Sequence, residues 1–366
     1  TANKCHFSNY DLLIKYDVCY NVTKEIIIPI FFSIISEIKE MGVRIHYKMY
    51  EYDNLLDSSN VAEEEWIKMA EDNNYNDYDG FVILHGTDTL TYTASALSFM
   101  LENLNKAVIL TGSQIPIFES RSDGTDNFVS SLIIAGGLNI PEVAVFFGTK
   151  LFRGNRIRKI SANEFYAFNS PNYPPLVEVG VGIKVNESAV LRLTTCSEVR
   201  VQAPWPDTVT FLRLFPNISD ALIKATFKPP VKGVVLESYG AGNTPTNRPI
   251  LLEEIRNACN NGVIVVNITQ CFNGFVDRLT VHLMVVPGYD MTPEAALTKL
   301  SYVLSRNDLS YVDKKKVTSN CTLLCCGPVE TYIFFNDTEY EQKFLFLLLL
   351  ISGLSFLRDT IGLSSL

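Results

Sequence analysis

Residues 81–116 constrain the fold of this chain more than any other stretch, because two short apolar runs flank a segment with helical periodicity. The runs are residues 81–84 and 108–110, and leucine or alanine recurs between them at spacings of three or four. A short buried strand, a helix and a second buried strand make a βαβ unit with parallel strands. The stretch therefore predicts an α/β fold.

Each apolar run ends abruptly in small, hydroxyl-bearing or acidic residues, HGTDT after the first and TGSQ after the second. In open parallel sheets, ligands bind where strands deliver their carboxyl ends. Thr87 and Asp88 are therefore candidate functional residues, offering a hydroxyl and a carboxylate. The structural alternative, that Asp88 or Thr89 merely caps the following helix, is about equally plausible from these residues alone.

The charge balance narrows the choice of partner. The chain has 366 residues, of which 31 are basic and 40 acidic, giving a net charge of −9. This balance argues against non-specific binding to nucleic acid or to anionic membranes. The apolar runs at residues 26–35 and 344–357 are shorter than the roughly 20 residues that span a bilayer. We expect a small-molecule partner, no nucleic acid and no membrane.

The eight cysteines lack the paired spacing of a disulfide scaffold, which is typical of a reducing compartment and predicts a cytoplasmic location. Cys321, Cys325 and Cys326 form a cluster near the end of the chain. The cluster has no second ligand pair and no nearby histidine, so we expect no metal there.

The alternation of strand and helix patterns divides the chain into two domains. Residues 43–200 form the first block, residues 201–207 a linker with two prolines, and residues 208–312 a second block. The predicted fold is α/β: a larger N-terminal domain with a doubly wound, mostly parallel sheet covered by helices on both faces, and a smaller C-terminal α/β domain. Residues 1–42 and the partly apolar tail at 313–366 are not expected to extend these domains.

A basic stretch, RGNRIRK, runs from Arg153 to Lys159. A solvated loop is the usual explanation for such a charge run. A lysine held near Asp88 and Thr87 would instead act as the base that a hydroxyl needs, since burial and neighbouring charges readily change the pKa of a lysine. The spacing does not show whether Lys159 reaches Thr87.

Two other polar turns carry weaker signals. Ser58 and Ser59 precede a helix expected to begin near residue 61, where Asn60 and Glu63 match a capping box; both serines would also suit a carboxylate at the same sheet edge. The YGAGN turn ending at Asn243 lacks the third glycine of a dinucleotide fingerprint, so NAD binding is a weak hypothesis.

Taken together, several of these motifs resemble those of the type I, cytoplasmic L-asparaginases, including the animal asparaginase domain. The matching motifs are HGTDT, TGSQIP, RSDG, LFRGNR followed by Lys159, SPNYPPL and GYDMTPEAALTKLSYVL. The resemblance covers roughly residues 43–312, and motifs of this length are specific.

The resemblance implies hydrolysis of L-asparagine to L-aspartate and ammonia without metal or cofactor. It assigns catalysis to Thr87, Asp88 and Lys159, and binding of the substrate's α-carboxylate to Ser58 and Ser59, while Asp88 also holds the α-amino group. It further implies a homodimer or homotetramer, in which Asn243 reaches the site of a neighbouring subunit.

The chain also departs from the family pattern. Family members open with a strand leading into TGGTIG, whose first threonine is the usual nucleophile, and no such motif occurs in residues 1–42. The sequence therefore predicts an asparaginase weakened by loss of this threonine, with Thr87 in an assisting role. The alternative is a catalytically inactive asparagine- or aspartate-binding protein, or a gene-model fragment. Glutamine side activity and allosteric regulation cannot be judged from these residues.

Overall fold

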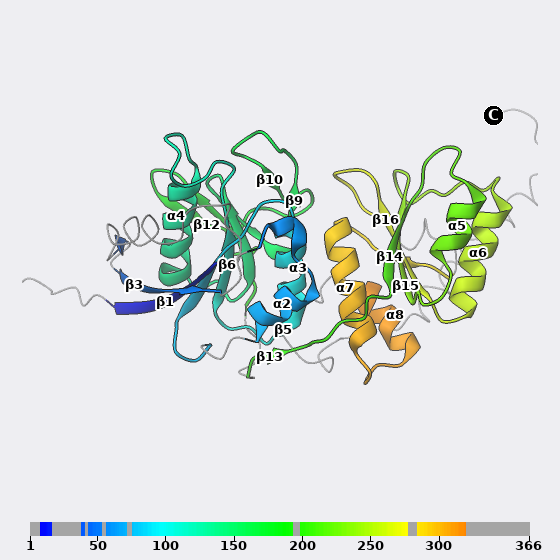
Figure 1. Ribbon diagram of the computed structural model, residues 1–366, viewed down its shortest axis with the longest axis horizontal. Coiled ribbons are helices and arrows are strands. Elements are labelled where there is room, and N and C mark those ends of the chain that lie inside the picture. Colours follow the sequence, from blue (N-terminus) through cyan, green and yellow to red (C-terminus); the bar gives the residue numbers. More distant parts are fainter. Residues whose placement is uncertain are drawn as a thin grey trace, which may run out of the picture. The chain divides into compact units, whose positions relative to one another are not determined.

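The computed structural model of this protein describes residues 8–16, 38–40, 43–52, 56–71, 75–192, 198–276 and 284–319. These residues form two α/β domains, the first built on a nine-stranded sheet and the second on a four-stranded sheet (Figure 1). No helix in these ranges is both long and apolar enough to cross a membrane. The predicted fold class is confirmed.

The central strands of the first sheet are parallel and its edges are antiparallel. Antiparallel pairs add β8, β11 and β12 at one edge and β2 at the other. In spatial order the strands are β12 (Ile183–Val185), β11 (Val177–Val179), β8 (Lys150–Arg153), β7 (Val143–Phe147), β6 (Ala107–Thr111), β4 (Gly80–Leu84), β1 (Ser8–Tyr16), β3 (Val43–Glu51) and β2 (Ile38–Glu40).

Both faces of this sheet are buried, because successive strand residues alternate between two apolar cores. In β4, Phe81 and Ile83 belong to one core and Val82 to the other. Helices α2 (Glu63–Ala70) and α3 (Leu90–Met100) cover the first face, and α4 (Gly124–Gly137) covers the second (Figure 1). This burial explains why the central strands are apolar runs rather than alternating patterns.

Short elements complete the first domain and lead into the second. Helices η1 (Ser58–Asn60) and η2 (Gly154–Arg156) are 3₁₀ turns, and β9 (Arg158–Lys159) pairs with β10 (Phe168–Asn169). In the region of the predicted linker, β13 (Arg200–Val201) pairs with β5 (Leu101–Glu102). Trp205 is buried after this strand, and its Nε1–H donates to the carbonyl of Gln202 at 2.9 Å.

The second domain is a parallel sheet in the order β14 (Val209–Arg213), β15 (Gly233–Ser238), β16 (Ile264–Thr269) and β17 (Val286–Pro287). Helices α5 (Asp220–Thr226) and α6 (Pro249–Asn260) lie on one face, and α7 (Pro293–Ser305) on the other (Figure 1). Residues Tyr302 and Val303 of α7 join the first domain's core, and Ser95 of α3 lies 2.7 Å from Thr298, oxygen to oxygen. Helix α7 therefore links the two domains.

Three details of the structure differ from the sequence expectations. Strand β1 lies in the middle of the first sheet, although residues 1–42 were not expected to extend that domain. Helix α8 (Tyr311–Ser319) crosses the expected boundary at residue 312, because Lys314 and Lys315 bind the backbone carbonyls of Leu304 and Met284 and Val317 is buried. Helix α8, with its three consecutive lysines at 314–316, is therefore part of the second domain.

The predicted capping box at Asn60 and Glu63 is wrong. Helix α2 has Ala62 at its N-cap, and Glu65 accepts a hydrogen bond from the Ala62 backbone N–H at 2.9 Å. The reason is that Asn60 already belongs to the 3₁₀ turn that Asp57 caps.

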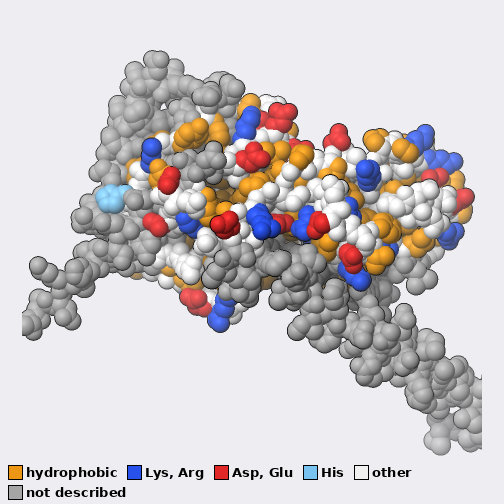
Figure 2. All heavy atoms as spheres, turned by 90° about the horizontal axis from the view of Figure 1, so that it is seen from below, with side chains coloured by type: hydrophobic (Ala, Val, Ile, Leu, Met, Phe, Trp, Pro, Cys, Tyr) orange, Lys and Arg blue, Asp and Glu red, His pale blue; other side chains and the backbone are white. Residues whose placement is uncertain are grey.

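Acidic and basic side chains are interspersed on the face of the molecule shown in Figure 2. Neither positive nor negative side chains dominate that face, and the net charge of the chain is a modest −9. The cluster of Cys321, Cys325 and Cys326 and the apolar run at 344–357, considered above, lie outside the described residues.

Candidate active site

The HGTDT turn sits at the carboxyl edge of the first sheet. Strand β4 ends at Leu84, and the His85 N–H still donates to the Thr111 carbonyl at 2.8 Å, which extends the pairing with β6 by one residue. Helix α3 begins at Leu90, so Thr87 and Asp88 lie in the turn between strand and helix. This placement matches the site predicted from the sequence pattern.

Lys159 joins the two candidate residues of this turn. Its Nζ donates to Thr87 Oγ1 at 2.8 Å and to Asp88 Oδ1 at 2.7 Å. The Asp88 side chain is 58% exposed and that of Lys159 22%. Such a partly exposed pair contributes about 0–1 kcal/mol to folding, so stability alone gives little reason for it. A lysine between a hydroxyl and an accessible carboxylate is an arrangement suited to moving protons.

The structural alternative for Asp88 receives no support from the turn. Thr89 occupies the N-cap position of α3, but no side chain caps this helix. The Thr89 hydroxyl instead donates to the Ser58 carbonyl at 2.6 Å. The Asp88 carboxylate is thus available to Lys159 rather than used on the helix.

That bond to Ser58 brings the predicted carboxylate-binding turn against the HGTDT turn. Asp57 holds the turn in shape by accepting from both the N–H and the hydroxyl of Ser59, at 2.9 and 2.8 Å. Ser58 is buried, whereas Ser59 is exposed. Their role toward a substrate stays a prediction, but their position beside Asp88 and Thr87 is the one that role requires.

His85 is fixed inside the protein and is not placed to act as a base. Its Nδ1 lies 2.7 Å from the Gly86 carbonyl and its Nε2 2.9 Å from Thr93 Oγ1, which also accepts from Trp66 Nε1 at 3.0 Å. Burial lowers the pKa of His85 to about 4. The neutral ring therefore donates from Nδ1 to the peptide that carries Thr87.

A second loop, TGSQ after β6, packs against the HGTDT turn. Gly112 permits the close approach, and Asp123 holds the shape of the loop. A Cβ on Gly112 would lie 2.2 Å from the His85 carbonyl oxygen, so only glycine permits this approach. Asp123 accepts from the backbone N–H groups of Gln114 and Ile115 at 3.0 and 3.2 Å. Asp123 therefore orders this loop.

The stretch from Arg153 to Lys159 is not a solvated loop. Arg153 is buried and bonds Glu142 through Nε at 2.6 Å and Nη2 at 3.1 Å. Arg156 is also buried and pairs with Asp290 at 2.6 Å. The basic residues have specific partners because the segment passes between the two domains. Sequence reasoning missed Asp290, although it lies in the GYDMT motif.

Asn243 is the one candidate residue that the structure does not bring to this site. It follows β15 in the second domain, where its backbone bridges to Tyr239, and its side chain is exposed. Among the described residues, no hydrogen bond links it to Thr87, Asp88 or Lys159.

Comparisons with known proteins identify the family of this chain. Residues 20–191 match the sequence model of the asparaginase N-terminal domain, and residues 208–316 match that of the glutaminase/asparaginase C-terminal domain. The chain is 46% identical over 280 residues to an L-asparaginase of Dirofilaria immitis, covering 74% of this chain and 48% of that protein. It is also 46% identical over 282 residues to the human 60 kDa lysophospholipase, covering 75% and 49%. The chain thus spans about half the length of these curated relatives.

The match to one solved structure covers almost all of that structure and most of this chain. The crystal structure of L-asparaginase I from Vibrio cholerae O1 biovar eltor superimposes with a TM-score of 0.78 at 41% identity. The match covers 86% of this chain and 98% of that one. With both family-model domains matched and 41% identity to this L-asparaginase I, the chain belongs to the asparaginase family.

Proposed function

We propose that this protein hydrolyses the side-chain amide of L-asparagine to L-aspartate and ammonia at the edge formed by Thr87, Asp88 and Lys159. The observation that supports this most is the placement of Lys159 Nζ within hydrogen-bond distance of both Thr87 Oγ1 and Asp88 Oδ1. Ser58 and Ser59 lie on the adjoining turn, which is joined to the HGTDT turn by the bond from the Thr89 hydroxyl to the Ser58 carbonyl, and we assign binding of the α-carboxylate to these serines.

The chemistry is acyl transfer through a hydroxyl nucleophile. The hydroxyl oxygen adds to the amide carbon, and its proton passes to the relay of Thr87, Lys159 and Asp88. When the carbon–nitrogen bond breaks, the relay returns that proton and ammonia leaves. Water then cleaves the resulting ester, which releases L-aspartate and restores the hydroxyl. Neither a metal nor a cofactor takes part in this scheme.

A second segment reaches the same edge. Tyr16, the last residue of β1, is the register partner of Leu84, which directly precedes His85. The end of β1 therefore lies beside the end of β4, directly before the HGTDT turn. Thr23 is the sole threonine in residues 17–42 of the sequence, and it lacks the glycines of the TGGTIG motif. We infer that turnover is weaker than in family members that carry this motif.

Ammonia release from L-asparagine by the full chain tests this proposal. We expect measurable turnover that Lys159→Ala and Thr87→Val abolish, whereas Lys224→Ala, on an exposed face of α5, leaves it unchanged. Thr23→Val shows whether Thr23 supplies the attacking hydroxyl. Equal rates in the parent and in Lys159→Ala would contradict the proposal.

Calorimetry with L-aspartate separates the enzyme from the alternative, a catalytically inactive binding protein. Binding that Asp88→Asn and Ser58→Ala weaken, without ammonia release in any condition, would establish the alternative. If the folded parent shows neither binding of L-aspartate nor ammonia release, both the enzyme and the binding-protein hypotheses are contradicted.

We further infer that the protein acts as a homodimer or homotetramer in the cytoplasm. The exposed Asn243, unconnected to the Thr87 cluster of its own chain, suits a residue that serves a neighbouring subunit's site. Mixing inactive Lys159→Ala with inactive Asn243→Ala tests this, because activity returns only if the two residues act on the same site from different chains. The free thiols of Cys259 and Cys271 support a reducing location.

A further inference from the structure

In the segment that carries Lys159, neighbouring side chains contact different domains. Arg156 ends the 3₁₀ turn η2, whereas residues 157–159 are extended, so the side chains of these three residues point alternately to opposite sides. Ile157 is buried in the core of the first domain, and Lys159 bonds Thr87 and Asp88 of that domain. Arg156 and Arg158 pair instead with Asp290 and Glu294 of the second domain. One short strand thus receives contacts from both domains.

The two ion pairs both involve residues at or near the N-terminal end of α7. Arg156 Nη1 lies 2.6 Å from Asp290 Oδ2, and Arg158 Nε lies 3.6 Å from Glu294 Oε2. Asp290 precedes the helix and Glu294 lies in its first turn, after the N-cap Thr292. Asp290 thus lies in the turn that leads into α7, and Glu294 is held in the first turn of the helix itself.

Because the Arg158–Glu294 pair is largely buried, loss of either charge is costly. Glu294 retains 10% of its side-chain exposure and Arg158 25%. Burial raises the pKa of Glu294, and the nearby positive charge of Arg158 opposes that rise. Removing either charge leaves the other buried without its counter-charge, which favours a shift of the segment toward solvent.

The opposite side of the segment is tightly packed against the first domain. A Cβ on Gly154 would lie 2.8 Å from Ser98 Oγ and 2.9 Å from the Ala94 carbonyl of α3, so this end of the segment has no free space. At the other end, Lys159 pairs with Phe168 of β10. Arg156 and Arg158 lie between these points; in the first domain the guanidinium of Arg156 lies 5.7 Å from the centre of the Tyr173 ring, and the ion pairs of both arginines are made with the second domain.

We propose that Asp290 and Glu294 are positioning residues, which hold Arg156 and Arg158 and thereby keep Lys159 within hydrogen-bond distance of Thr87 and Asp88. This inference rests on the proposed function for its kinetic consequence, but its geometric part can be measured without turnover. It makes the second domain a direct support of the first domain's site.

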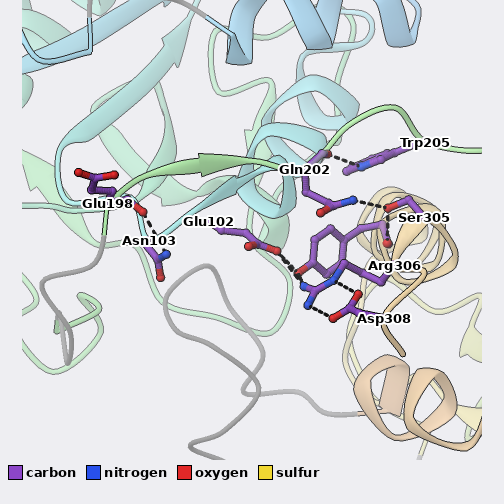
Figure 3. A network of polar contacts seen from close by, with 9 residues as sticks. Glu102, Asn103, Glu198, Gln202, Trp205, Ser305, Arg306 and Asp308 are labelled. Carbon is purple, nitrogen blue, oxygen red and sulfur yellow. Dashed lines mark hydrogen bonds and ion pairs between the residues drawn. The ribbon is translucent and has the colours of Figure 1, made fainter. Parts of the chain in front are cut away.

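A third ion pair between the domains provides a matched control. Arg306, at the C-cap of α7, bonds Glu102 of β5 through Nη1 at 2.9 Å and also binds Asp308 (Figure 3). Its partial burial resembles that of the Arg158 pair, with 17% of Arg306 and 27% of Glu102 exposed. The pair lies at the other end of α7 from Asp290 and Glu294, so breaking it perturbs domain contact without touching the Lys159 segment.

The first experiment measures the position of Lys159 directly. The full chain is treated with a trace of acetic anhydride, and mass spectrometry compares the acetylation rate of Lys159 with that of exposed Lys224 in the same molecule. We expect Glu294→Gln and Asp290→Asn to raise the relative rate severalfold, because an amine released from its hydrogen bonds reacts faster. Glu102→Gln should leave it at the parental value. Equal relative rates in all four proteins would overturn the proposal.

The second experiment measures kcat and KM for L-asparagine in the same variants. A misplaced Lys159 should lower kcat by about tenfold and change KM little. Arg158→Lys, which keeps the positive charge, should recover part of the loss, whereas Arg158→Met should not. A purely structural role would instead lower the unfolding midpoint in parallel with Glu102→Gln and leave kcat at the parental value.

The two experiments distinguish failure of this inference from failure of the proposed function. If the acetylation rates respond as expected while the parent shows no hydrolysis, the positioning holds and asparagine hydrolysis is refuted. If hydrolysis depends on Lys159 while both kcat and acetylation ignore Asp290 and Glu294, the function holds and the positioning is refuted.

Discussion

The Nε2 atom of His85 lies 2.9 Å from the Oγ1 atom of Thr93, a residue in the first turn of helix α3. This bond ties the turn that carries Thr87 and Asp88 to the buried surface of α3. Burial favours the neutral ring, in which Nδ1 donates to the Gly86 carbonyl and Nε2 accepts from the Thr93 hydroxyl. The site is thus supported by a histidine that is protonated only well below its usual pKa.

We expect this histidine to make folding stability depend on pH. Its pKa is about 4 in the folded protein and near 6.5 in the unfolded chain, so the unfolded chain binds one more proton between these values. Stability is complete above pH 6.5 and falls by about 3 kcal/mol as the pH drops to 4. Urea unfolding of the parent and of His85→Gln from pH 7 to pH 4 measures this, with the other acidic groups common to both. Parallel curves for the two proteins would contradict it.

Gly112 should be irreplaceable even by alanine. The added Cβ would meet the His85 carbonyl at 2.2 Å, a backbone atom that cannot move without disturbing the pairing of β4 with β6. We expect Gly112→Ala to destabilise the protein by about 2–4 kcal/mol. Gly182→Ala is the control, since nothing lies within 4 Å of its Cβ position, and it should change stability by less than about 0.5 kcal/mol. The measurement is the free energy of unfolding in urea.

The buried pair of Arg153 and Glu142 should be the most costly ion pair to break. Arg153 also donates to the Ala189 carbonyl, and Glu142 accepts from the Leu191 N–H, so either substitution leaves buried groups without partners. We expect Arg153→Met to cost about 3–5 kcal/mol of folding free energy. The exposed Lys316, 3.7 Å from Asp313, gives the comparison, and Lys316→Gln should cost at most about 1 kcal/mol. Similar losses in both variants would show that the Arg153 pair is not buried in solution.

The two described cysteines should react with alkylating reagents at very different rates. Cys271 is exposed, whereas Cys259 is buried in the second domain's core and burial raises the pKa of its thiol. Iodoacetamide at neutral pH should therefore modify Cys271 within minutes and Cys259 only after unfolding. Peptide mass spectrometry of a time course reads both sites. Rapid modification of Cys259 in the native protein would argue against its packing beside Met284.

Local periodicity was sufficient to locate the elements that form the site. The apolar runs at 81–84 and 108–110 became β4 and β6 with the expected parallel pairing, and the helix between them became α3. Thr87 and Asp88 could be singled out for the same reason, since the turn after a buried strand is a local feature. Lys159 was identified only as a candidate, because no local rule reports a contact across 72 positions.

What sequence reasoning missed depends on contacts between segments distant in the chain. Strand β1 could not be recognised from SNYDLLIKY, because its place between β3 and β4 is decided by its neighbours. Arg156 and Arg158 looked like a solvated charge run because their partners, Asp290 and Glu294, lie more than a hundred residues away. The helix start at Ala62 was displaced because a 3₁₀ turn used the preceding residues.

The alternation of residues 157–159 has a genetic consequence. Loss of the Ile157 codon would keep every charge of this stretch, yet it would move Arg158 and Lys159 each to the opposite side. The lysine amine would face the acidic end of α7, and an arginine would face Thr87. A reading frame that tolerates such an indel elsewhere in the chain would not tolerate it here.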